Sequence, residues 1–149
     1  MDDDVLSAFA AYQRSQGLAP ATIKNRQSII RGINRRTGLS VLTASTAMLR
    51  EHVGREGVSL GTRRTERAVL VAFYSFALEE GYRDDDPTAR LPKIRVGRGT
   101  PRPFTQEQVT RMLESGAYAK TRAMILLGYY QGFRVSSISR VHGVDVDIA

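Results

Sequence analysis

Apolar residues recur at spacings of three and four along most of the chain, a spacing typical of amphipathic helices. In the N-terminal part it predicts four helices, at about 4–16, 20–36, 44–55 and 60–80. Asp4 occupies the N-cap position of the first, and Pro20 lies in the first turn of the second, where its missing N–H costs nothing. The residues expected to face inward are Val5, Leu6, Phe9, Tyr12, Ile23, Ile30, Ile33, Met48, Leu49, Val53, Val69, Leu70, Phe73, Phe76 and Ala77.

A second region of helical pattern follows, and three helices are predicted in it, over 105–115, 120–131 and 135–142. Thr105 and Gln108 have the spacing of a capping box at the start of the first. The second is strongly apolar, and its Tyr129 and Tyr130 are expected to pack in a core. Residues 144–148 alternate in polarity like the beginning of a strand. The pattern as a whole predicts a mainly α protein.

The two helical regions are separated by a segment that lacks apolar periodicity. It is basic, and its prolines and glycines alternate, at Pro92, Gly97, Gly99, Pro101 and Pro103. Such a composition is typical of a linker. The chain of 149 residues is long enough for one small domain and a partial one. We therefore expect a domain over 1–93, a basic linker over 94–101 and an incomplete second domain over 102–149.

The charge is strongly positive and unevenly distributed. The net charge is +7, and eleven Arg and Lys residues face only three acids between Arg14 and Arg67. Acids gather instead at 2–4 and 84–86. Such segregation indicates a basic face that binds a polyanion, although an ordinary basic surface would have the same composition.

Two groups of basic residues are the candidates for phosphate contacts. Lys24, Arg31 and Arg35 lie with Ser28 on one stripe of the second predicted helix. Arg63, Arg64 and Arg67 crowd the first turns of the fourth, where the helix dipole disfavours cations, so an external anion is expected beside them. Possible base or phosphate contacts on the second helix are Thr22, Asn25, Gln27 and Ser28.

Other kinds of chemistry find no support in the sequence. The chain has no cysteine, which excludes a disulfide scaffold and a thiolate metal site. His52 stands alone on a short helix with no partner for metal or acid–base chemistry, and His142 is interpreted as a packing residue. We expect no metal and no cofactor. We also see no secretory signal and no apolar run that could span a bilayer, so we expect no membrane association and a cytoplasmic location.

The most specific motif lies near the C-terminal end of the sequence. Gly132-Phe133-Arg134 is followed by Val141, seven places after the arginine, and by Asp145-Val146-Asp147, starting eleven places after it. This pattern resembles the first active-site box of the tyrosine recombinases, the phage-integrase family. Ser137 stands where the family usually has an acidic residue.

The order of the remaining elements resembles the same family over the whole chain. Residues 1–93 are similar to its N-terminal core-binding domain, and 102–149 to the opening of its catalytic domain. The matching signatures are Pro20-Ala21-Thr22-Ile23, Thr62-Arg63-Arg64, Phe73-Tyr74-Ser75-Phe76-Ala77, Glu80-Gly81-Tyr82, Asp86-Pro87-Thr88-Ala89 and Pro103-Phe104-Thr105. The resemblance implies a four-helix SAM-like core-binding bundle, followed by a helical N-terminal fragment of the catalytic domain.

The resemblance also implies site residues and a partner. Arg134 corresponds to the arginine that contacts the scissile phosphate, and the partner is double-stranded DNA. The lysine, the His-x-x-Arg box and the nucleophilic tyrosine of the family have no counterpart among these 149 residues, so we expect this chain alone to be inactive. Because few residues are available to cover the apolar helix, we expect self-association through 120–131.

Three functions are compatible with these observations. The leading hypothesis is the DNA-binding portion of a phage-type tyrosine recombinase that takes part in site-specific DNA integration or recombination in a bacterial host cytosol. The alternative is a non-catalytic recombinase-derived DNA-binding protein, such as a repressor or a competitor for integrase sites. A helical module that binds an acidic protein is a third class, but it leaves the register of the arginine box unexplained.

Overall fold

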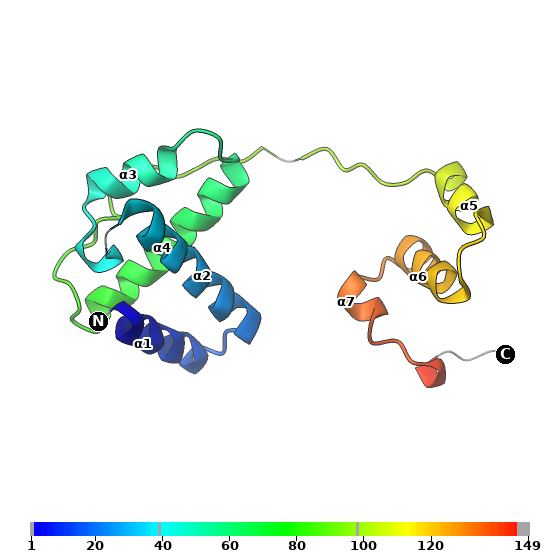
Figure 1. Cartoon of the computed structure of the whole chain (residues 1–149), viewed down its shortest axis with the longest axis horizontal. Coiled ribbons are helices and arrows are strands. Elements are labelled where there is room, and N and C mark those ends of the chain that lie inside the picture. Colours follow the sequence, from blue (N-terminus) through cyan, green and yellow to red (C-terminus); the bar gives the residue numbers. More distant parts are fainter. Residues whose placement is uncertain (1, 39, 98, 146–149) are drawn as a thin grey trace. The chain divides into compact units, whose positions relative to one another are not determined.

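The computed structural model describes residues 2–38, 40–97 and 99–145, and every regular element in these ranges is helical. The chain divides into two compact units, Met1–Arg98 and Gly99–Ala149. The boundary between them falls inside the predicted linker. Figure 1 shows α1 to α4 gathered in the first unit and α5 to α7 in the second.

The first unit contains four α-helices and one short 3₁₀ turn. They are α1 (Asp2–Ser15), α2 (Pro20–Thr37), η1 (Val41–Thr43), α3 (Thr46–Gly54) and α4 (Leu60–Glu79). Ser45 and Ser59 cap the starts of α3 and α4, each through a side-chain oxygen that accepts a backbone N–H. At the end of α2, Gly38 has a φ of +67°, a left-handed conformation that favours glycine.

The core of this unit forms where α4 packs against α1, α2 and α3 (Figure 1). Phe9 from α1 meets Phe73 and Phe76 of α4 at ring-centroid distances of 5.4 and 5.1 Å. Leu91, which follows α4 in the sequence, is also buried in this core. Nearly all of the first-unit residues expected to face inward belong to this core or pack against it. The two exceptions are Ile23, which is buried outside it, and Met48, which is half-buried.

Two polar side chains hold η1 against α4. The buried Tyr74 hydroxyl donates to the Val41 carbonyl at 2.5 Å. Arg83 donates to the carbonyls of Leu42 and Ala44, and its guanidinium lies 5.6 Å from the centre of the Tyr74 ring. Burial raises the pKa of Tyr74, so the hydroxyl stays a neutral donor.

The second unit is smaller and more open. It contains α5 (Gln106–Glu114), α6 (Ala119–Tyr130), α7 (Val135–Ile138) and the 3₁₀ turn η2 (Gly143–Asp145). The capping box of Thr105 and Gln108 is formed at the start of α5 as expected. Val109 is buried, but α6 has no buried residue. Gly132 has a φ of +66° and turns the chain between α6 and α7.

Two sequence-based predictions of local structure in the first unit are wrong. Asp4 is not an N-cap, because α1 already begins at Asp2; acidic residues in the first turn suit the helix dipole, so the sequence does not select one of them as the cap. The third helix starts at Thr46 instead of residue 44, since Ser45 caps it and the preceding residues form η1.

The second unit also differs from the prediction. The last helix ends at Ile138, and a 3₁₀ turn occupies Gly143–Asp145 where a strand was expected to begin. In that turn the Asp145 carboxylate accepts the His142 N–H at 2.8 Å. The rest of the predicted strand, 146–148, lies outside the described residues. Tyr129 and Tyr130 are 36% and 52% exposed rather than packed in a core, because their helix lies on the surface of a small unit.

None of the helices in the described part of the chain is long and apolar enough to cross a membrane.

Candidate nucleic-acid interface

A groove runs between the first turns of α2 and α4. It has a volume of about 510 Å³ and is lined by five polar or basic residues and four small apolar ones. We call it the α2–α4 groove; its lining residues are Thr22, Asn25, Arg26, Gly61, Arg64, Thr65, Ala68, Val69 and Val96. The structure thus brings together three predicted site residues, Thr22 and Asn25 from one helix and Arg64 from the other.

The electrostatics of this groove favour an anion. Thr22 and Gly61 lie in the first turns of two helices of 18 and 20 residues, and neither first turn carries an acidic residue. The N-cap of α2, Ala19, supplies no side-chain hydrogen bond. The positive ends of two helix dipoles therefore border the groove, next to the exposed Arg64, although the Ser59 side chain already accepts the Thr62 N–H.

The predicted stripe on α2 is exposed to solvent. Lys24, Ser28, Arg31 and Arg35 are all exposed. Arg31 lies 3.5 Å from Asp3, an exposed pair that constrains it little. The stripe is therefore accessible to a ligand along its length.

Lys24 and Gln27 border a different hollow, of about 310 Å³, between α1 and α2. The side-chain amide of Gln27 donates to the Leu6 carbonyl at 3.1 Å and is half-buried. Gln27 thus holds α2 to α1, while Lys24 remains exposed. Of the stripe on α2, Lys24 borders this hollow, while other residues of α2, namely Thr22, Asn25 and Arg26, line the α2–α4 groove.

Arg63 and Arg67 are half-buried and have partners inside the protein. The Arg63 guanidinium donates to the Arg55 carbonyl at 2.5 Å, and that of Arg67 to the Leu91 carbonyl at 3.1 Å. The Nε atoms of both are buried with no hydrogen-bond partner among the described residues. We expected all three arginines at the start of α4 to need an external anion. Arg63 and Arg67 need one least, because backbone carbonyls already accept hydrogen bonds from their guanidinium groups.

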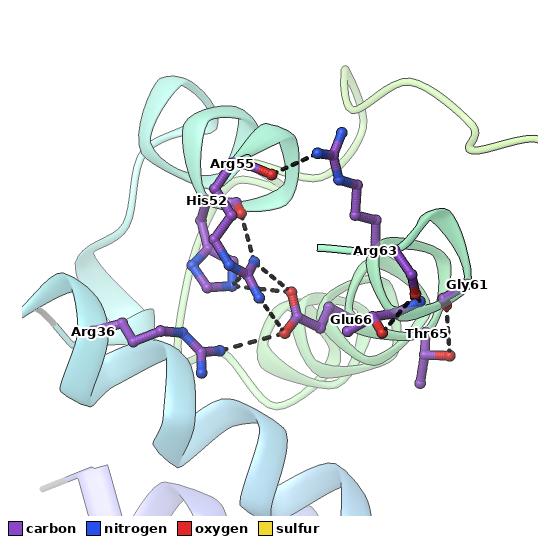
Figure 2. A network of polar contacts seen from close by, with 9 residues as sticks. Arg36, His52, Arg55, Gly61, Arg63, Thr65 and Glu66 are labelled. Atoms are coloured by element: carbon purple, nitrogen blue, oxygen red, sulfur yellow. Dashed lines mark hydrogen bonds and ion pairs between the residues drawn. The ribbon is translucent and has the colours of Figure 1, made fainter. Parts of the chain in front are cut away.

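Glu66 lies at the centre of a buried polar cluster on the same helix (Figure 2). Its carboxylate accepts two hydrogen bonds from Arg55, at 2.6 and 2.8 Å. Arg36 from α2 donates a third at 3.3 Å, and the His52 ring from α3 lies 3.2 Å away. One carboxylate therefore joins α2, α3 and the turn before α4 to α4 itself.

The environment of this cluster shifts the pKa values of its members. Burial alone raises the pKa of Glu66, but hydrogen bonds and charge from Arg55, with His52 and Arg36, outweigh it and leave that pKa below the ordinary value. Burial, and then the charge of Arg55, lowers the pKa of His52. The hydrogen bond from Arg55 to Glu66 raises the pKa of that guanidinium. The cluster therefore contains a carboxylate, two guanidinium groups and a neutral imidazole.

The interpretation of His52 as a residue with no partner for acid–base chemistry is thus wrong, because its ring lies against Glu66 and Arg55. Arg55 follows His52 by three residues in the sequence. Glu66 lies on another helix and reaches His52 only because α3 packs on α4. Arg26, Gly61 and Thr65 were missed as groove residues for the same reason. Gly61 had a signal in the sequence, because it precedes the predicted site residue Arg64 by three residues and so shares its helix face.

Arg134 lies in the second unit, at the N-cap of α7, with an exposed side chain. It makes no side-chain hydrogen bond or ion pair with the described residues. An exposed guanidinium carries no desolvation penalty that an acidic residue at position 137 would have to offset. Among the described residues no group of three His, Cys, Asp or Glu side chains could hold a metal ion.

The fold and the groove define the class: an all-helical protein of two units, with a basic groove between two helix N-termini. Comparison with solved structures finds the integrase of mycobacterium phage Brujita, with a TM-score of 0.60, 26% identity, and coverage of 95% of this chain and 50% of that one. Tyrosine recombinase XerD of Xanthomonas axonopodis pv. citri is 29% identical over 99% of this chain and 52% of its own length. XerD of Rhizobium meliloti is 32% identical over 72% of this chain and 40% of its own.

The chain is therefore a member of the tyrosine recombinase/phage integrase family, as its motifs predicted. No family model matches it. The chain spans about half the length of the XerD relative from Xanthomonas and of the phage integrase.

Proposed function

We propose that this chain is the DNA-binding portion of a phage-type tyrosine recombinase, acting in site-specific DNA integration or recombination. Residues 1–93 would be the core-binding domain, of the SAM-like type, 94–101 the linker, and 102–149 the first part of the catalytic domain. The observation that carries this proposal is the α2–α4 groove, in which the first turns of two helices, one of them without a side-chain cap, lie beside the exposed Arg64. Its partner is double-stranded DNA, and we place its action in the bacterial cytosol, where chromosomal DNA lies.

The contacts are assigned by accessibility. The exposed Arg64, with Lys24, Arg31 and Arg35, supplies the charge for phosphates. Thr22, Asn25 and Ser28 offer polar groups to base edges or phosphates, and the exposed Thr65 joins them from the groove wall, whereas Arg26 is half-buried and donates to Gln13 at 3.1 Å. Arg63, Arg67 and Gln27 have N–H groups to spare, but their bonds to backbone carbonyls give them a supporting role in the interface.

Arg64 provides the test. A phosphate contact releases counterions, so each one contributes about 0.9 to the slope of log K against log salt. We expect Arg64→Ala to weaken binding to duplexes of any sequence and to flatten that slope by about 0.9, which corresponds to about a five-fold loss at 0.15 M NaCl. Fluorescence anisotropy of a labelled duplex at several salt concentrations measures both quantities.

The matched control is Arg90→Ala, an exposed arginine of the same unit that borders a hollow with Asp85 and Asp86. Its slope should equal that of the wild type. If alanine at Arg64, Lys24, Arg31 and Arg35 each left the slope unchanged, the wrong face would have been assigned. A wild-type protein without salt-dependent affinity for duplex DNA would refute the function itself.

Ser137 supports one alternative, a non-catalytic recombinase-derived protein that acts as a repressor or as a competitor for integrase sites. The two functions differ in a recombination assay with a complete recombinase of the family. A repressor or competitor would inhibit strand exchange at the shared site in proportion to its occupancy of that site. No inhibition at saturating occupancy would exclude the alternative.

We also propose that the chain self-associates through residues 120–131. The support is one face of α6, where Leu126, Tyr129 and Tyr130, spaced three and four residues apart, are 42%, 36% and 52% exposed. Exposed apolar side chains clustered in this way are typical of interaction sites.

A further inference from the structure

The first turns of α4 have two faces with different surroundings. Gly61, Arg64, Thr65 and Ala68, spaced three and four residues apart, line the α2–α4 groove. Arg63 and Glu66 lie on another side, where Glu66 is buried and contacts Arg55, His52 and Arg36 (Figure 2). The contacts of Glu66 with Arg55, His52 and Arg36 on the other side of α4 therefore help to set the position of the side that lines the groove.

Arg55 is held at two points by α4. Its guanidinium donates both of its outer nitrogens to the Glu66 carboxylate, and its backbone carbonyl accepts from Arg63 at 2.5 Å. Arg55 begins the turn that leads to Ser59, the N-cap residue of α4. Arg63 and Glu66 thus fix the end of α3, the turn and the first two turns of α4 as one body.

The physical value of this arrangement is geometric. A buried ion pair typically adds little net stability compared with apolar side chains of similar size. A bidentate arginine–carboxylate pair, by contrast, fixes both position and direction, because two parallel hydrogen bonds allow one orientation. An apolar residue in place of Glu66 would fill the space but would leave Arg55, and with it the start of α4, without this constraint.

We infer that Glu66, acting through Arg55, is a positioning residue of the interface: it sets the start of α4 so that Arg64 reaches a phosphate. This inference rests on the proposed function. It predicts that the contribution of Arg64 to binding depends on an intact Glu66–Arg55 pair, although neither residue of the pair lines the α2–α4 groove.

A double-mutant cycle in the full chain tests this coupling. Duplex affinity is measured at 0.15 M NaCl for the wild type, Arg64→Ala, Glu66→Gln and the double variant, with folding checked by circular dichroism. We expect each single change to weaken binding about five-fold, the loss of one phosphate contact. The double variant should bind within two-fold of Glu66→Gln, because Arg64 is then no longer in position.

Arg55→Lys provides a second cycle that does not depend on the folding of the first variant. Lysine keeps the positive charge, so a direct phosphate contact at residue 55 would survive, whereas the bidentate geometry is lost. Under the proposal this variant also removes most of the effect of Arg64→Ala. Tyr12→Phe is the control; it removes the hydrogen bond from Tyr12 to Glu79 near the other end of α4, and its cycle with Arg64→Ala should be additive.

The outcomes separate this proposal from the proposed function. If Arg64→Ala keeps its full five-fold effect in both the Glu66→Gln and the Arg55→Lys backgrounds, the positioning role is wrong while DNA binding by this face stands. If the wild type binds no duplex DNA, both are wrong. Coupling in either background, with additivity in the Tyr12→Phe control, supports the positioning role.

Discussion

Replacement of Glu66 by alanine should strongly destabilise the first unit. The carboxylate is 7% exposed and accepts hydrogen bonds from Arg55 and Arg36. Alanine removes the negative charge that pairs with the guanidinium groups of Arg55 and Arg36. It also leaves the ring of His52, which is 3% exposed, without its nearest acidic neighbour.

The size of the effect follows from the exposure of the partners. Removal of one member of a buried ion pair typically costs about 3–5 kcal/mol, because the other charge stays buried. Here the side chains of Arg55 and Arg36 are 25% and 48% exposed, so both can turn toward water. We therefore expect the lower end, about 3 kcal/mol. For a domain of the size of Met1–Arg98, this corresponds to a melting temperature lower by roughly 12–24 °C.

Urea unfolding followed by circular dichroism, together with a thermal melt, measures this loss. The midpoint should fall at an unchanged m-value, because the surface exposed on unfolding stays the same. Glu51→Ala is the control: it removes an exposed carboxylate from α3 and should alter stability by less than about 0.5 kcal/mol. A loss below about 1 kcal/mol for Glu66→Ala would show that the cluster does not hold the helices together.

The remaining predictions concern pH, association and chemistry. The pKa values of His52 and Glu66 are lowered in the folded state, so on acidification the unfolded state binds protons at a higher pH than the folded state does. Unfolding free energy should therefore fall as the pH drops below about 6.5, by up to about 1.4 kcal/mol per unit for His52, and His52→Gln should remove this part. Leu126→Asp should make the chain monomeric in sedimentation while Thr121→Asp does not; a wild type that is monomeric at high concentration would remove the association. The 149 residues alone should form no covalent adduct with a nicked attachment-type duplex, because Arg134 is their only counterpart of the catalytic set; a denaturing gel with a shifted band would contradict this.

Local sequence determined most of the secondary structure. Apolar spacing placed the helices of the first unit to within a few residues, since each must bury one face against the others. The capping box of Thr105 and Gln108 was predictable because its two partners lie three residues apart. The turn η1 before α3 was not predicted, and its carbonyls accept hydrogen bonds from Tyr74 and Arg83, which are distant in sequence.

The family was also evident from the sequence, because its arginine box is a contiguous motif with fixed spacing. The same is true of the exposed stripe on α2, since residues three and four apart share a helix face whatever packs on the other side. Composition and spacing therefore predicted which helices carry the basic charge.

Only the tertiary structure decided what each charged side chain does. Arg63, Arg64 and Arg67 look alike in the sequence, yet the first and third donate to backbone carbonyls from other segments, while Arg64 alone is exposed in the groove. Glu66 and His52 gain their partners only when α3 packs on α4. The physical reason is that burial and pairing depend on neighbours brought together by folding, whereas helix formation depends on residues within one turn of each other.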